Sequence, residues 1–101
     1  MKELTEGHTF VLDSMEGKNP QRLEFIHKCM DAETGAFVTI TDGTTNEEVL
    51  RCLIKRIQYL NAKAGCRENS IVITKLEEAL MWLEKRTADR LSRGVEGTAA
   101  K

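Results

Sequence analysis

Two runs of apolar residues at helical spacing, separated by a short segment that contains Gly65, constrain this chain most strongly. The first run predicts a helix over residues 46–63. Its apolar positions are Val49, Leu50, Leu53, Ile54, Ile57 and Leu60. The second run predicts a helix from residues 67–69 to about 93, with Gly94 as its terminator. Its apolar positions are Val72, Leu76, Ala79, Leu80, Leu83 and Leu91. Two helices on so short a connection form an antiparallel αα-hairpin.

The length of this hairpin predicts that the chain associates with copies of itself. At 1.5 Å per residue the second helix is roughly 40 Å long, more than a small sheet can cover. One hairpin also cannot bury both of its faces. Four more apolar residues lie partly off the stripe that faces the first helix, namely Ile71, Ile73, Met81 and Trp82. We therefore expect a homo-oligomer in which hairpins from different chains pack together.

The residues before the hairpin predict a β meander over residues 8–42. Its expected strands are residues 9–14, 23–28 and 36–41, separated by turns that contain Gly17 and Gly35. Three short strands with a thin apolar face need a packing partner. The predicted fold class is therefore α+β, a short N-terminal antiparallel β-sheet followed by a long hairpin over residues 45–94. We expect a single domain over residues 1–101, with a flexible tail at residues 95–101.

The composition of the chain limits where in the cell we expect the protein and which partners we expect it to bind. The 101 residues carry 15 basic and 16 acidic groups, a net charge of −1 that does not predict DNA binding. The charges divide unevenly, with 4 − 10 = −6 over residues 1–50 and 11 − 6 = +5 over residues 51–101. No membrane-spanning run and no signal peptide are visible, so we expect a cytosolic protein. Three cysteines without CxxC spacing predict free thiols, and no metal or other cofactor is expected.

The pattern favours binding over catalysis, because the motifs of common enzyme classes are absent from the sequence. Arg86, Arg90 and Arg93 are spaced to share a face at the end of the second helix, and Trp82 lies one turn earlier. Guanidinium groups bind phosphates in a bidentate manner, and flat rings stack on bases. The alternative is that these cations only offset the helix macrodipole.

The other end of the second helix offers a second set of candidates. Arg67 and the free N–H groups of the first helical turn favour an anion there. Asn69 either contacts the edge of a base or caps the helix. Tyr59 lies off the apolar stripe of the first helix, so its ring is either an interface contact or a stacking platform.

The segment from Asp42 to Thr98 resembles a known family. Its Thr-Lys-Leu-Glu-Glu-Ala stretch, its Arg-Thr-Ala-Asp-Arg pair and its Gly-Val-Glu-Gly-Thr tail look like those of the phage and prophage Thoeris anti-defence proteins. The hairpin resembles, more distantly, phage sponges that sequester cyclic oligonucleotides. The resemblance implies a non-enzymatic sponge, which holds cyclic ADP-ribose isomers made by host TIR-domain sensors. It also implies dimers or hexamers assembled through the hairpins and, in some relatives, separate sites for cyclic trinucleotides.

The resemblance also implies a ligand site. Matching motif positions places an adenine-stacking ring at Tyr59, a hydrogen-bonding amide at Asn69, and two pyrophosphate-binding guanidinium groups at Arg86 and Arg90. Arg67 is the candidate for a trinucleotide site. Asn69 and Arg86 lie roughly 25 Å apart on a straight helix, so one small ligand cannot touch both in one chain. We expect pockets shared between antiparallel neighbours. The alternative functions are a cyclic-nucleotide-degrading enzyme and a small oligomeric adaptor without a nucleotide ligand.

Overall fold

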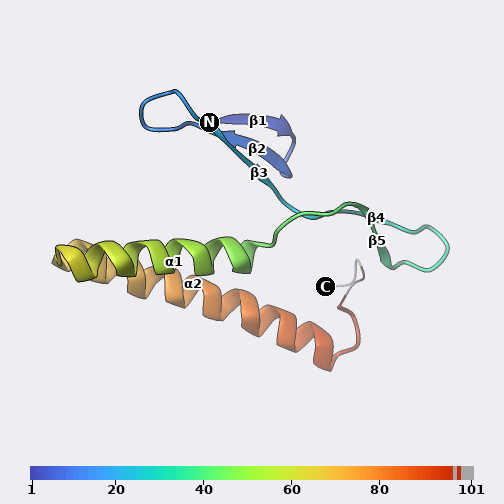
Figure 1. Cartoon of the computed structure of the whole chain (residues 1–101). Helices are drawn as coiled ribbons and strands as arrows, with labels where there is room; N and C mark the ends of the chain where they lie inside the picture. The colour runs from blue at the N-terminus through green and yellow to red at the C-terminus, as the bar shows by residue number, and fades with distance from the viewer. Residues whose placement is uncertain (97, 99–101) are drawn as a thin grey trace. The chain divides into compact units, whose positions relative to one another are not determined.

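The computed structural model describes residues 1–96 and residue 98, and the chain divides into two compact units, Met1–Thr45 and Asn46–Lys101. The first unit contains all the strands, and the second contains the helical hairpin (Figure 1). The order of antiparallel strands followed by two helices confirms the predicted α+β class. Of the tail that was predicted to be flexible, residues 97 and 99–101 lie outside the described residues.

The first unit holds five strands in two sheets, where the sequence predicted three strands in one. A three-stranded antiparallel sheet has the order β1-β2-β3, and a separate two-stranded ribbon pairs β4 with β5. The strands are β1 (Lys2–Thr5), β2 (Thr9–Leu12), β3 (Gln21–Glu24), β4 (His27–Met30) and β5 (Phe37–Thr41). β1 was not predicted, because its residues do not alternate between apolar and polar.

A close backbone crossing explains why the strand predicted over residues 23–28 is interrupted. Thr44 donates its N–H to the carbonyl oxygen of Glu24 at 2.8 Å and accepts one from Ile26 at 2.9 Å. A Cβ on Gly43 would lie only 2.5 Å from the carbonyl carbon of Phe25, so only glycine fits at this crossing. The segment before the first helix thus binds the carbonyl of Glu24 and the N–H of Ile26, while Phe25 donates its N–H to the carbonyl of His8 at 2.8 Å. These contacts separate β3 from β4.

The second unit is the predicted antiparallel hairpin, formed by α1 (Asn46–Lys63) and α2 (Arg67–Ser92) (Figure 1). The bounds of α1 are those predicted, and Glu47 and Glu48 lie in its first turn, where acidic side chains favour the positive end of the helix dipole. Gly94 follows the end of α2 with φ +71°, as a C-terminal glycine should. Neither helix is long and apolar enough to cross a membrane, within the part of the chain that the structure describes.

The seam between the helices is narrow, and it differs in phase from the predicted stripe. Ile54 of α1 is the one buried apolar residue among those described, at 8% exposure. On α2 the half-buried apolar positions are Ile73, Leu76, Leu80 and Leu83. Ile73 was predicted to lie off the stripe, which is wrong. Val72, Ala79 and Leu91 were predicted to lie on it, yet all three are exposed. The helix crossing, which periodicity does not reveal, sets this rotation.

Candidate functional site

Two contacts between the helices fix the register of the hairpin and define its broad faces. Arg51 of α1 and Glu84 of α2 form an ion pair at 3.1 Å, and the Asn61 amide nitrogen donates to the Ser70 hydroxyl at 3.3 Å. Arg51 and Glu84 therefore point to the same broad face of the hairpin. The opposite broad face is found by rotating away from this pair at about 100° per residue.

That opposite face carries exposed apolar residues on both helices, with the cations Lys75 and Arg86 at similar angles on α2. Four residues lie about 120–180° around their helices from the ion pair. They are Leu53 and Leu60 on α1, and Val72 and Ala79 on α2, and we call them the apolar face. Leu53, Leu60 and Val72 are 42%, 37% and 41% exposed. Exposed apolar side chains at helical spacing on both helices make this surface a candidate for contact with a second protein surface.

Two of the predicted ligand residues lie near the closed end of the hairpin, where α1 joins α2. Tyr59 is 58% exposed, and the Lys63 ammonium lies 5.4 Å from the centre of its ring. Asn69 is half-buried in the first turn of α2. Its side chain is not the helix cap, because the sulfur of Cys66 accepts the Asn69 backbone N–H at 3.4 Å. The capping alternative for Asn69 is therefore wrong, and its amide remains available for another contact.

The other two predicted ligand residues, Arg86 and Arg90, lie one helical turn apart near the open end of the hairpin. Arg86 is exposed and forms no ion pair or hydrogen bond within the part of the chain that the structure describes. Arg93 is also exposed, and it pairs with Asp89 at 3.1 Å. Lys85 lies 4.9 Å from the centre of the Trp82 ring, which is 55% exposed. An aromatic surface and several cations are therefore grouped at this end.

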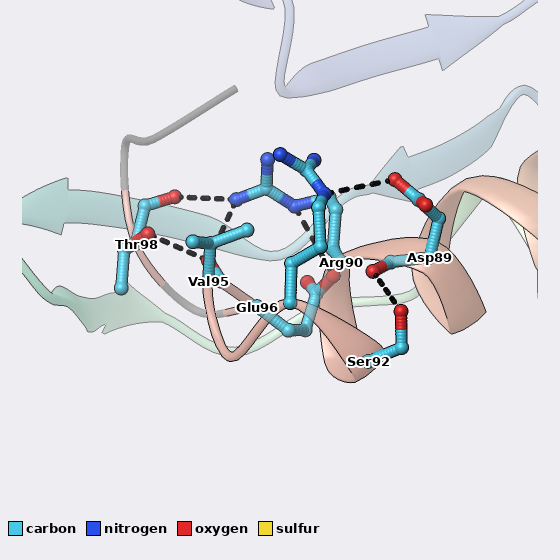
Figure 2. Close-up of polar contacts among 7 residues, drawn as sticks. Asp89, Arg90, Ser92, Val95, Glu96 and Thr98 are labelled. Carbon is cyan, nitrogen blue, oxygen red and sulfur yellow. Dashed lines mark hydrogen bonds and ion pairs between the residues drawn. The ribbon is translucent and has the colours of Figure 1, made fainter.

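Arg90 differs from its neighbours because it turns toward the C-terminal segment (Figure 2). One of its terminal nitrogens, Nη2, donates to the carbonyl oxygens of Val95 at 2.9 Å and Thr98 at 2.8 Å. Its Nε lies 3.2 Å from a carboxylate oxygen of Glu96, and the side chain is only 8% exposed.

The turn that holds Arg90 is built by the end of α2. Val95 donates its N–H to the carbonyl oxygen of Arg90 at 2.9 Å, and Gly94 donates its N–H to the carbonyl oxygen of Leu91 at 3.1 Å. This pair of hydrogen bonds is the Schellman motif. Sequence reasoning missed Glu96 and this turn. The signal that could have found them is Gly94 just past the helix, which predicts that the next residues fold back.

Arg67, the candidate for a second anion site, is exposed at the first position of α2. It lines an open hollow of about 300 Å³ on the surface of this helix. The other lining residues are Ser70, Ile71, Thr74 and Lys75. Two of these residues are cations, whereas the two hydroxyl groups already form hydrogen bonds within the hairpin: the Ser70 hydroxyl accepts from Asn61 at 3.3 Å, and the Thr74 hydroxyl donates to the Ser70 carbonyl oxygen at 3.1 Å.

Cysteines and acidic side chains add no metal site to these groups within the residues that the structure describes. Cys29, Cys52 and Cys66 are free and exposed. Among residues 1–96 and 98, no group of three or more His, Cys, Asp or Glu side chains is placed to hold a metal ion. The hairpin carries Tyr59, Asn69 and Arg67 near its closed end and Trp82, Arg86 and Arg90 near its open end, with exposed apolar residues between them.

The fold defines an α+β protein in which the candidate binding groups lie on a long helical hairpin. The family model described as the hairpin domain of Acb2/Tad1 matches residues 30–88, more than half of the chain, and the protein belongs to this family. A relative from Bacillus phage SBSphiJ7, "Thoeris anti-defense 1", is 57% identical over 61 residues. These residues make up 59% of this chain and 43% of the relative, so the chain spans less than half of the relative's length.

Proposed function

We propose that this protein binds cyclic ADP-ribose isomers and sequesters them without cleavage, in pockets shared between protomers of a homo-oligomer. The observation that carries the proposal is the separation of complementary groups along one hairpin. Tyr59 and Asn69 lie near its closed end, and Arg86 and Arg90 near its open end. The 17 positions from Asn69 to Arg86 span about 25 Å of helix, more than one small nucleotide can bridge.

The chemistry of the two ends suits the two halves of such a ligand. An exposed ring stacks on adenine, and an amide hydrogen-bonds the edge of the base. Guanidinium groups bind a pyrophosphate through charge-assisted, bidentate hydrogen bonds. The closed end carries the ring and the amide together with Arg67, but Arg86 and Arg90, the two arginines matched to the pyrophosphate, lie at the open end. We therefore propose that a complete pocket places the closed end of one hairpin beside the open end of another.

The apolar face supports the self-association that this pocket requires. It runs along both helices, from Leu60 near the closed end to Leu53 near the middle, with Val72 and Ala79 beside them on α2. Ala79 is small enough to let a second helix approach closely. Two such faces packed together give a four-helix bundle, the usual way for hairpins to bury their remaining apolar surface. An antiparallel arrangement brings each closed end to the partner's open end.

The phage relative supports the biological role. Its name, Thoeris anti-defense 1, describes a protein that acts against Thoeris defence. We propose the same role for this chain, in the cytoplasm of the bacterial host, where the bound signal no longer reaches its effector. The hollow around Arg67 is our candidate for a separate cyclic trinucleotide site, because Arg67 and Lys75 among its lining residues supply charge for phosphates.

A release experiment tests this function against its rivals. The protein is incubated with each cyclic ADP-ribose isomer, separated from free nucleotide by filtration and denatured by heat, and the released compound is identified by mass spectrometry. Sequestration predicts that the intact cyclic isomer is recovered. A degrading enzyme would yield a linear product instead. An adaptor without a nucleotide ligand would carry nothing through the filtration step, and either result would overturn the proposal.

A further inference from the structure

The open end of the hairpin contains an internal anion at one of the proposed phosphate-binding groups. The carboxylate of Glu96 lies 3.2 Å from Arg90 Nε, while the carbonyl oxygens of Val95 and Thr98 accept from Nη2 (Figure 2). With only 8% of the Arg90 side chain exposed, these oxygens surround much of the guanidinium group. Charge-assisted oxygen contacts of this kind are what a bound phosphate would also provide.

We propose that Glu96 is an affinity-determining residue of the anion site, because its carboxylate is the counter-ion that the phosphate of a ligand replaces at Arg90. The inference rests on the proposed function only for the identity of that ligand. Arg90 has to give up part of its oxygen shell before a phosphate can bind in its place. An affinity for anions measured on this protein is therefore the affinity left after competition with Glu96.

Glu96 is the partner most readily exchanged, for two reasons. Its side chain is 36% exposed, so it leaves Arg90 for water without a large solvation cost. It also carries a negative charge that an entering phosphate repels, whereas the carbonyl groups of Val95 and Thr98 are neutral. Exchange places the phosphate on the Nε side of Arg90.

The backbone around Arg90 allows this exchange to remain local. The N–H of Val95 is held by the Arg90 carbonyl at 2.9 Å, and Gly94 adopts φ +71° without steric strain. Thr98 also donates its backbone N–H and its hydroxyl to the Val95 carbonyl, at 3.1 Å and 2.6 Å. These contacts do not involve the Glu96 side chain, so its carboxylate leaves while the turn keeps its fold.

The test compares two variants that each remove one negative charge from the same end of the hairpin. Glu96→Gln removes the proposed competitor. Asp89→Asn is the matched control, because Asp89 pairs with the exposed Arg93 at 3.1 Å. The full chain and both variants are titrated with inorganic pyrophosphate by calorimetry. We expect Glu96→Gln to bind pyrophosphate about fivefold more tightly than the unmodified chain, and Asp89→Asn to stay within about twofold of it.

Equal gains in the two variants would mean that net charge alone sets the affinity, and would overturn the proposal. Absence of pyrophosphate binding in all three proteins would overturn it as well. The same titrations with a cyclic ADP-ribose isomer separate this inference from the proposed function. If pyrophosphate behaves as expected and no isomer binds, the exchange stands and the proposed ligand is refuted. If the isomer binds all three proteins equally well, sequestration stands and the role of Glu96 is refuted.

Discussion

Replacing Leu53 with alanine is expected to weaken self-association strongly. Leu53 is 42% exposed on the apolar face, and packing against a second copy would bury that remainder. Full burial of a leucine side chain is worth about 1.5–3 kcal/mol, so the exposed share corresponds to about 0.6–1.3 kcal/mol per protomer. A two-fold interface counts the residue twice, giving about 1.2–2.6 kcal/mol per dimer. The dimer dissociation constant should therefore rise about 8-fold to 80-fold.

Sedimentation equilibrium over a range of protein concentrations measures this constant directly. Met81→Ala is the matched control. The sequence grouped Met81 with the residues left over for an interface, but this side chain, 50% exposed, lies outside the apolar face, on the side of α2 that points away from α1. We expect it to change the dissociation constant by less than about threefold. If Leu53→Ala and Met81→Ala have equal effects, or if the unmodified chain is monomeric at all concentrations, the reasoning about the apolar face is refuted.

Three further predictions concern the ligand site and the two units. Arg86→Ala should weaken nucleotide capture by about 1.5–3 kcal/mol through loss of a charge-assisted contact. Calorimetry checks this, and an unchanged affinity would remove Arg86 from the site. Ile54→Ala should lower the free energy of unfolding by about 2–4 kcal/mol, because it opens a cavity in the seam. Leu91→Ala, at 63% exposure, should lower it by less than about 1 kcal/mol in the same urea titration. Gly43→Ala should destabilise the first unit by about 1–3 kcal/mol or more, since its Cβ meets backbone at 2.5 Å. Amide hydrogen exchange should show that loss in the strands and not in the hairpin.

The sequence predicted the helices well because their signals are local. The bounds of α1 and α2 follow from a regular apolar stripe, from Glu47 and Glu48 in the first turn of α1, and from a glycine shortly after each helix. The rotation of α2 about its own axis could not be predicted in the same way. Val72 and Ile73 are adjacent and both apolar, and only the crossing of the helices decides which of them faces α1.

The strand arrangement of the first unit and the surroundings of Arg90 could not be predicted, because they depend on contacts that no local sequence pattern reveals. The break between β3 and β4 arises where Gly43 approaches the backbone of Phe25, 18 positions earlier. Alternation within residues 23–28 gives no sign of it. Arg86 and Arg90 likewise look equivalent at helical spacing. Their surroundings differ at the end of α2, because the turn after Gly94 brings Glu96 beside Arg90 and not beside Arg86.

The most direct test of the central claim mixes two variants that each disable a different end of the hairpin. Tyr59→Ala and Arg86→Ala are each expected to weaken nucleotide binding by about tenfold or more, and they are unfolded and refolded together in equal amounts. If a pocket takes its ring from one protomer and its guanidinium groups from the partner, half of the dimers regain one intact pocket. Calorimetry should then find about one quarter of the sites of the unmodified protein, at unchanged affinity. A mixture that binds no more nucleotide than either variant alone would contradict shared pockets.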